Sequence, residues 1–276
     1  MSPTAPTLNR FGVALLAEWR KLTSTALWWV LGVGMAAYLA FMGAVLAFTF
    51  AAAPPSPDTP AITGVDAALA VLGTLNAIGY VFPLLVGTLL VTTEVRHRTL
   101  TQSLLVEPRR GVLLGAKLVV AAAVGLLYGV LGVVGLLATS APVLELVGDG
   151  IFLTDPAVLR VLGLGILVTG LWAVLGAAFG AVVPNQVAAI VAVLAFTQFV
   201  EPIARLGLSA VDSLSGVAAF LPGAAADAVV GASLFGEISG GGGDLLPGWA
   251  GALVLLAYAA VLTVVGRWTT FARDVA

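Results

Sequence analysis

The sequence predicts an all-α integral membrane protein with six transmembrane helices, and three observations support this prediction. Hydrophobic residues make up 60% of the 276 positions and charged residues only 9%, with a mean hydropathy of +1.11. A soluble domain carries about 25% charged residues, so a chain this apolar needs lipid around it. Six apolar runs reach or approach the roughly 20 residues that cross a bilayer. The basic residues gather in alternate loops between these runs, which is typical of multi-pass proteins.

The expected spans follow the apolar runs, in the order 27–50, 67–91, 112–139, 159–183, 187–200 and 249–267. The fifth run is the weakest, because its apolar stretch is short and ends at Gln198, Glu201 and Pro202. Pro184 and Asn185 separate it sharply from the fourth run, so we count it as a span. The first run is too long for the apolar part of a signal peptide, which has about 7–15 residues.

The charges predict the topology. With six spans, the loops on one side hold 10 of the 12 basic residues, namely Arg10, Arg20, Lys21, Arg96, Arg98, Arg109, Arg110, Lys117, Arg267 and Arg273. The other side holds Arg160 and Arg205 together with 10 of the 14 acidic residues. Because Lys and Arg mark cytoplasmic loops, we expect both termini and the loops 92–112 and 184–186 in the cytoplasm. The loops 51–66, 140–158 and 201–248 are then external.

The segment before the first span is amphipathic. Apolar residues recur in it at helical spacing, at Leu8, Phe11, Leu15, Trp19 and Leu22. Polar residues fall elsewhere on the helical wheel, at Arg10, Glu18, Lys21 and Thr25. This pattern favours an interfacial helix over 8–25 that lies on the membrane surface. The alternative is a plain N-terminal extension of the first span.

The loop 92–112 carries the densest charge of the chain and its single histidine, His97. Leu100, Leu104 and Leu105 are expected to form one apolar side of a short helix that Pro108 ends. Two interpretations remain open at this point. The loop is either a solvated cytoplasmic connection or a helix that docks onto a cytoplasmic partner.

The segment 203–245 is too broken to span and too apolar for a free loop. We expect short re-entrant or surface helices on the external side, because irregular backbone at membrane depth needs protein around it. One helix is predicted around Val211, Leu214, Val217 and Ala218, and Pro222 can start another. The glycines at 240–243 indicate a flexible tether. Glycines spaced by four at 125, 129, 176 and 180 allow close helix packing and weakly suggest a dimer face.

The chain lacks the residues that catalysis or metal binding would need. Lys21 and Lys117 follow Arg20 and Ala116, so no Gly-Lys pair of a phosphate-binding P-loop is present. A single histidine and no cysteine argue against a His- or Cys-based metal site. No acidic residue is expected at mid-membrane, and Glu201 with Arg205 predicts a local ion pair. We therefore expect no enzyme activity, no catalytic residue, no cofactor and no nucleic-acid partner.

An ordered set of segments resembles a known family. The set comprises AEWRKLTST at 17–25, EVRHRTLTQSLLVEPRRGVLLGAKL at 94–118, VVPNQVAAIV at 182–191, EP at 201–202, LPGAAADAVV at 221–230 and RD at 273–274. Their order and spacing resemble ABC-2-type permeases, the membrane subunits of bacterial ABC exporters. The resemblance implies one permease domain over 1–276, with an elbow helix at 8–25, a coupling loop at 94–110 and external helices within 203–245. It also implies a homodimer or pseudo-symmetric dimer in the cell membrane. Because this chain lacks a P-loop, ATP and Mg belong to a separate ATPase subunit.

The resemblance assigns roles to particular residues. Contacts with the ATPase are expected from Glu94, Arg96, Arg98, Leu104 and Glu107. Polar residues of the second and fifth spans are candidates to line the path, namely Thr74, Asn76, Tyr80, Thr88, Thr197 and Gln198. For these six, hydrogen bonding between helices is the alternative role. The composition suggests a drug-like, peptide or lipid amphiphile as cargo. The rival functions are an ion-coupled secondary transporter and an intramembrane enzyme.

Overall fold

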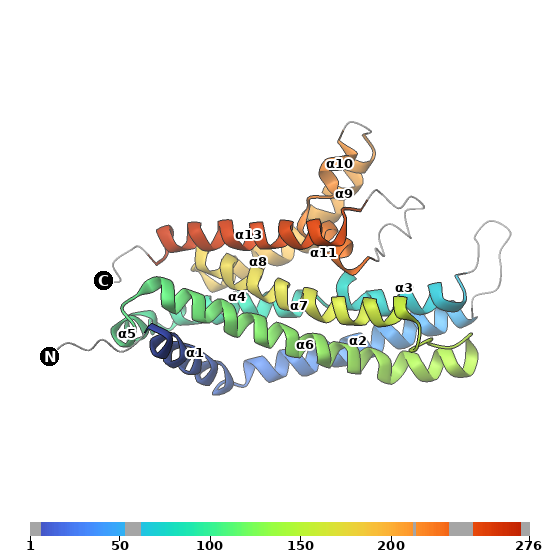
Figure 1. Ribbon diagram of the computed structural model, residues 1–276, viewed down its shortest axis with the longest axis horizontal. Coiled ribbons are helices and arrows are strands. Elements are labelled where there is room, and N and C mark those ends of the chain that lie inside the picture. The colour runs from blue at the N-terminus through green and yellow to red at the C-terminus, as the bar shows by residue number, and fades with distance from the viewer. Residues whose placement is uncertain (1–6, 53–61, 212–213, 232–244, 272–276) are drawn as a thin grey trace.

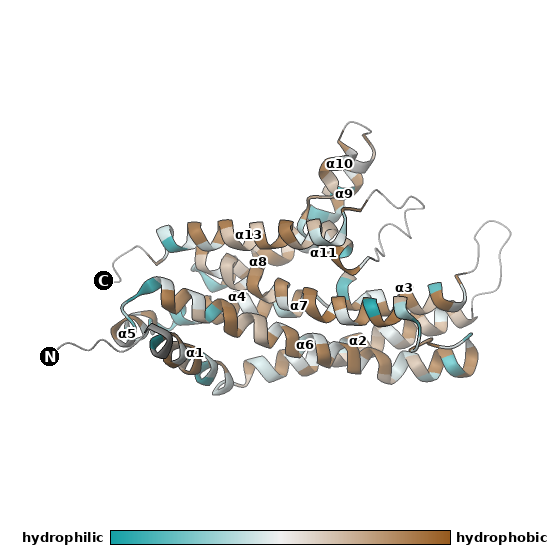
Figure 2. Ribbon diagram, in the orientation of Figure 1, coloured by the Kyte–Doolittle hydropathy of each residue, from teal (hydrophilic) through white to brown (hydrophobic). Residues whose placement is uncertain are grey.

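The computed structural model describes residues 7–52, 62–211, 214–231 and 245–271. Its secondary structure is entirely helical over these ranges, and six helices are long and apolar enough to cross a membrane. This confirms the predicted fold class and defines the chain as a multi-pass membrane protein. Hydrophobic residues predominate along the long helices, and hydrophilic residues concentrate near the ends of the bundle (Figure 2).

The six spans follow the predicted order. They are α2 (Leu27–Ala52), α3 (Gly64–Ala77) with α4 (Val81–Arg96), α6 (Arg110–Val147), α7 (Pro156–Val182), α8 (Gln186–Ala195) with the π-helix η1 (Phe196–Val200) and α9 (Glu201–Ser209), and α13 (Gly248–Thr269). The shorter helices are α1 (Thr7–Thr23), α5 (Leu100–Val106), α10 (Ser215–Ala218) and α11 (Pro222–Val230).

The helices α1 and α5 and the C-terminal end of α13 lie at the same end of the bundle (Figure 1). We call this the α5 end. It carries the segments for which the charge pattern predicts a cytoplasmic location, and α9 and α10 project from the bundle away from it (Figure 1). The side of the membrane that the α5 end faces stays a prediction from the charges.

The second span is not the continuous helix that we expected over 67–91. It breaks between α3 and α4 at residues 78–80. Pro83 explains the break. Its ring clashes with the carbonyl four residues earlier, and proline has no backbone N–H to donate to that carbonyl. That carbonyl belongs to Gly79, which tolerates the irregular backbone.

The fifth span is longer than the predicted 187–200. The helix continues through Pro202 to Ser209 because the wide turn of η1 precedes the proline. The backbone N–H of Glu201 donates to the carbonyl of Phe196, five residues earlier. A π turn of this kind shifts the hydrogen-bond pairing of the backbone by one residue. The helix can therefore continue past Pro202, which has no backbone N–H to donate.

The third span also exceeds its prediction, since α6 runs to Val147 where an external loop was expected from residue 140. The polar residues at this point are satisfied within the helices. The hydroxyl of Thr139 donates to the carbonyl of Ala40 at 2.6 Å, and that of Ser140 donates to Leu136 at 2.7 Å.

The spaced glycines pack helices together within one chain. A Cβ at Gly125 would lie 2.6 Å from the carbonyl oxygen of Thr169 in α7. A Cβ at Gly180 would lie 2.6 Å from the carbonyl oxygen of Thr88 in α4. These positions hold α7 against α6 and α4, so they do not form the dimer face that their spacing suggested.

The short helices of the segment 203–245 are confirmed in part. Pro222 starts α11 as predicted, and almost every residue of this helix is buried against the surrounding spans. The helix predicted around Val211–Ala218 is a single turn, α10. The glycines 240–243 and the RD pair at 273–274 lie outside the described residues.

Candidate functional site

Four charged side chains meet inside the bundle at the α5 end, and we call them the α5-end cluster: Glu18, Lys21, Glu94 and Lys117. Nζ of Lys117 lies 2.5 Å from Oε2 of Glu18 and 2.9 Å from Oε2 of Glu94. Nζ of Lys21 lies 2.5 Å from Oε1 of Glu18 and 2.9 Å from Oε1 of Glu94. Two cations and two anions therefore alternate in a closed, electrically balanced ring.

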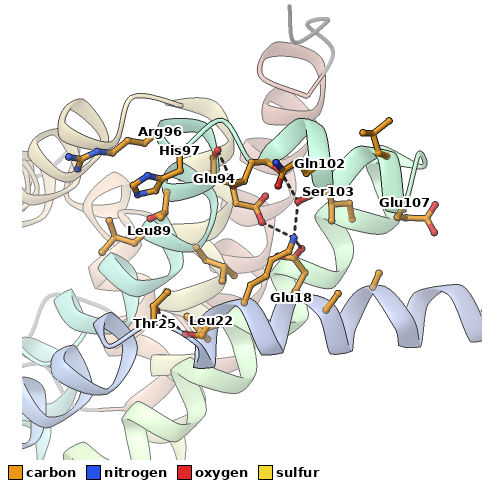
Figure 3. Close-up of a pocket in the computed structure, with 18 of the residues that line it drawn as sticks. Glu18, Leu22, Thr25, Leu89, Glu94, Arg96, His97, Gln102, Ser103 and Glu107 are labelled. Atoms are coloured by element: carbon orange, nitrogen blue, oxygen red, sulfur yellow. Dashed lines mark hydrogen bonds and ion pairs between the residues drawn. The ribbon is translucent and has the colours of Figure 1, made fainter.

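The α5-end cluster joins four helices. Lys21 and Glu18 come from α1, Glu94 from the last turn of α4, and Lys117 from the start of α6. The ammonium of Lys21 also donates to Oγ of Ser103 in α5 at 2.8 Å. Figure 3 shows Glu18 and Glu94 directed toward the same nitrogen, with Ser103 beside them. The ring thus ties α5 to the interfacial helix and to two spans.

Burial sets the strength of these contacts. The side chains of Lys117 and Glu18 are 0% and 1% exposed, whereas that of Lys21 is 41% exposed. Burial lowers the pKa of Lys21, but hydrogen bonds and charges from Glu18 and Glu94 outweigh it and raise the pKa above its ordinary value of 10.5. Lys21 therefore stays charged at neutral pH.

The helix α1 is confirmed, and Leu15 and Leu22 of its predicted apolar face pack against the core. Glu18, which was expected on the polar side, is buried as well. Ala14 and Glu18 face the bundle, while Phe11 and Trp19 are each 37% exposed. The buried ammonium of Lys117 explains this orientation, because an unpaired charge in an apolar interior is costly. Lys117 is the only charged residue in the apolar run 112–139, which is the sequence signal that an acidic partner had to be nearby.

A cavity of about 1160 Å³ opens beside the α5-end cluster (Figure 3). It lies between α1, α4 and α5 and reaches the first residues of α2 and α8, Leu27 and Gln186. Aliphatic residues such as Val86, Leu89 and Leu113 form part of its wall, and polar and charged residues form the rest. Three members of the cluster, Glu18, Lys21 and Glu94, belong to the lining. The sequence did not indicate this cavity, because its walls come from segments far apart in the chain.

The five residues predicted to contact an ATPase separate into two groups. Glu94 and Glu107 are each 8% exposed, and Glu94 is engaged in the α5-end cluster. Oε1 of Glu107 accepts from the backbone N–H of Arg109 at 3.0 Å. Leu104 is half-buried. Of the five, Arg96 and Arg98 are exposed.

The short helix α5 is confirmed, but its predicted apolar side is not continuous. Leu100 is buried, Leu104 is half-buried, and Leu105 points outward with 79% of its surface exposed. Leu104 and Leu105 are consecutive, and consecutive residues of a helix do not share one face. Leu105 is thus available at the surface of the α5 end.

The six residues predicted to line a path mostly pack inside the chain. The hydroxyls of Thr88 and Thr197 donate to carbonyls of their own helices at 2.8 Å, and Thr74 is fully buried. The hydroxyl of Tyr80 donates to the carbonyl of Thr197 at 3.1 Å. Five of the six are buried, namely Thr74, Asn76, Tyr80, Thr88 and Thr197, whereas Gln198 is exposed. These five are therefore enclosed within the chain, and a role in a path stays a prediction for them.

A second buried group of charges, the α11 cluster, consists of Glu201, Arg205 and Asp227. Nη2 of Arg205 lies 2.9 Å from Oε1 of Glu201, which confirms the predicted pair, and Nη1 lies 2.8 Å from Oδ2 of Asp227. The backbone N–H of Gly223 donates to Glu201 at 2.5 Å, and the amide of Asn76 donates to Asp227 at 2.7 Å. Asp227 was missed because α11 folds back from 22 residues further along the chain.

The α11 cluster is not electrically balanced. Within the part of the chain that the structure describes, one arginine faces two carboxylates. Oε2 of Glu201 and Oδ1 of Asn76 are buried without a hydrogen-bond partner. Both residues border a space of about 20 Å³, which is the size of one water molecule. No group of three or more His, Asp or Glu side chains suited to a metal ion occurs among the described residues.

No protein-family model matches the sequence, and no curated protein matches it significantly. The membrane class therefore stands on the fold and its six apolar helices. The resemblance to ABC-2-type permeases carries weight only as a basis for a proposal.

Proposed function

We propose that this chain is the membrane-spanning permease subunit of a bacterial ABC exporter, driven by a separate ATP-binding subunit. One observation carries the proposal. The short helix α5 lies between the second and third spans, and Lys21 connects it to α1 and α4 through contacts of 2.8 Å with Ser103 and 2.9 Å with Glu94. A displacement of α5 would therefore move the interfacial helix and the second span with it.

In this proposal the α5 end faces the cytoplasm, as the charge pattern predicts. Arg96 and Arg98, which are exposed, contact the ATPase, and the outward Leu105 adds an apolar contact. ATP and Mg bind to the partner, whose closure pushes on α5. Two permease copies enclose the path, and the cargo is an amphiphile.

The test combines the full chain in proteoliposomes with a P-loop ATPase that co-purifies with it. Arg96→Ala with Arg98→Ala should reduce the stimulation of ATP hydrolysis by the permease at least tenfold, because both exposed cations leave the contact surface. Arg20→Ala is the matched control, since Arg20 is exposed on α1 and lies outside the proposed contact. Unchanged stimulation in the double variant would remove these residues from the mechanism.

A second function, ion-coupled transport without an ATPase, has one observation in its favour. The α11 cluster places two carboxylates and one arginine within or beside a candidate span, where ionisable residues often mark ion pathways. This function predicts uptake or efflux driven by a proton or sodium gradient in liposomes that contain this chain alone. Transport that needs the ATPase and ATP would eliminate it.

A further inference from the structure

The cavity at the α5 end extends along the second span to the depth of one bilayer leaflet. On α4 its lining runs from Arg96 at the end of the helix to Val86. Ten residues of α-helix span about 15 Å. Half of the roughly 30 Å hydrocarbon core of a bilayer has the same depth. The cavity thus reaches from the end of the span to near the middle of the membrane.

The deep part of the cavity is apolar. Val86, Leu89 and Leu90 line it from α4. With about 1160 Å³, the cavity exceeds the roughly 300–1,000 Å³ of a pocket for a drug-sized molecule.

The charges that reach the mouth of the cavity are cationic. Arg96 is exposed, and its Nη1 donates to the neutral amide oxygen of Gln186 at 3.1 Å. Lys21 is 41% exposed at its side chain, but Glu18 and Glu94 already balance its charge, so Arg96 is the main cation for a ligand. The carboxylates in the lining, Glu94 and Glu107 among them, are each at most 8% exposed. A bound molecule therefore meets positive charge at the surface and aliphatic side chains below it.

We propose that this cavity binds an anionic phospholipid of the surrounding bilayer, with the phosphate near Arg96 and an acyl chain along α4. The complementarity is twofold, since the charge lies at the depth of the headgroups and the apolar wall at the depth of the chains. This site goes beyond the proposed export function and does not require the ATPase. A lipid wedged between α1 and α4 would stabilise the position of the α5-end cluster.

The test measures lipid binding by native mass spectrometry of the full chain in detergent, titrated with palmitoyl-oleoyl phosphatidylglycerol or phosphatidylcholine. Phosphatidylglycerol should bind more tightly. Arg96→Gln should weaken its binding about fivefold, the effect of one basic residue near an anionic lipid. Arg96→Lys should retain most of the binding, because it keeps the charge. Arg109→Gln is the control, since Arg109 is exposed at the same end but does not line the cavity.

A second pair of variants tests the apolar wall. Leu89→Trp should fill the cavity and abolish the tight phosphatidylglycerol site. Val134→Trp should leave it intact, because Val134 faces outward on α6 and is not part of the lining. Equal binding of the two lipids, an equal loss in Arg109→Gln, or full binding in Leu89→Trp would each overturn the proposal. All of these measurements use the chain without an ATPase. A failure of the lipid site is therefore distinguishable from a failure of the export function, which is tested by ATPase stimulation.

Discussion

The two buried charge clusters differ in their balance. In the α5-end cluster two lysines alternate with two glutamates, and each glutamate contacts both cations. In the α11 cluster a single arginine serves two carboxylates, and a backbone N–H and an asparagine amide supply further donors. Removing one partner of a buried ion pair typically costs about 3–5 kcal/mol because the other charge is left uncompensated. The number of partners that remain should therefore decide how each cluster tolerates a substitution.

The difference also indicates two kinds of role. A balanced ring can persist without further ions and is suited to joining α1, α4, α5 and α6. An unbalanced group depends on the hydrogen bonds from Gly223 and Asn76 and on its surroundings. The predictions below alter the balance of each cluster in turn, beginning with the largest expected effect.

Arg205→Met should cause the largest loss, because it removes the cation that both Glu201 and Asp227 contact. We expect a loss of about 3–5 kcal/mol in the free energy of unfolding, or failure to fold. Thermal unfolding in detergent measures this effect. Arg160→Met is the control, since Arg160 is exposed. Equal unfolding temperatures for the two variants would show that the arginine is not needed for stability.

Lys117→Met should cost less than Arg205→Met, although Lys117 is fully buried. Lys21 remains in contact with both Glu18 and Glu94 and compensates part of their charge. We expect a loss of about 2–4 kcal/mol in the free energy of unfolding, because a buried charge again loses one of its partners. Adding Glu18→Gln should recover part of this loss, because the ring again has equal numbers of cations and anions. A double variant less stable than Lys117→Met alone would contradict the balanced ring.

Removal of a carboxylate should affect the two clusters differently. Glu18→Gln unbalances the α5-end cluster and should cost about 1–3 kcal/mol, because two buried hydrogen bonds to charged donors weaken. Asp227→Asn relieves the excess negative charge of the α11 cluster and should cost less than about 1 kcal/mol. Chemical or thermal unfolding of the two variants in one detergent gives the comparison. The reverse order would refute the role that we assign to charge balance.

The smallest effect concerns pH. The pKa of Lys21 is raised above 10.5 by its glutamate partners, so its stabilising contribution is complete below pH 10.5. The contribution is lost as the pH rises through the higher pKa of the folded state. Solvent screening keeps it small, because Lys21 is half-exposed. Lys21→Met should remove this loss of stability at alkaline pH, measured as the unfolding temperature against pH. The same pH dependence in the variant and in the unchanged protein would argue against the contribution of Lys21.

The sequence alone predicted the features that depend on residues close together in the chain. Apolar length and charge segregation predicted the six spans, and amphipathic spacing predicted α1 and α5. The i, i+4 relation predicted the Glu201–Arg205 pair, and Pro222 predicted the start of α11. Each of these features depends on residues close together in the chain.

The features that were missed depend on distant contacts. Glu18 turns inward because Lys117, 99 residues later, requires a partner. Asp227 reaches Arg205 only because α11 folds back among the spans. The break at Gly79 is an exception, since Pro83 signals it locally and the apolar run masked it. The cavity could not be predicted, because it forms only where α1, α4 and α5 meet.

Identification of the proteins that co-purify with the full chain from its own membrane tests the central proposal most directly. The account predicts a P-loop ATPase in a stoichiometric complex with the chain, and loss of this subunit when Arg96→Ala and Arg98→Ala are combined. A chain that purifies without any ATPase and transports its cargo in liposomes without ATP would contradict the account.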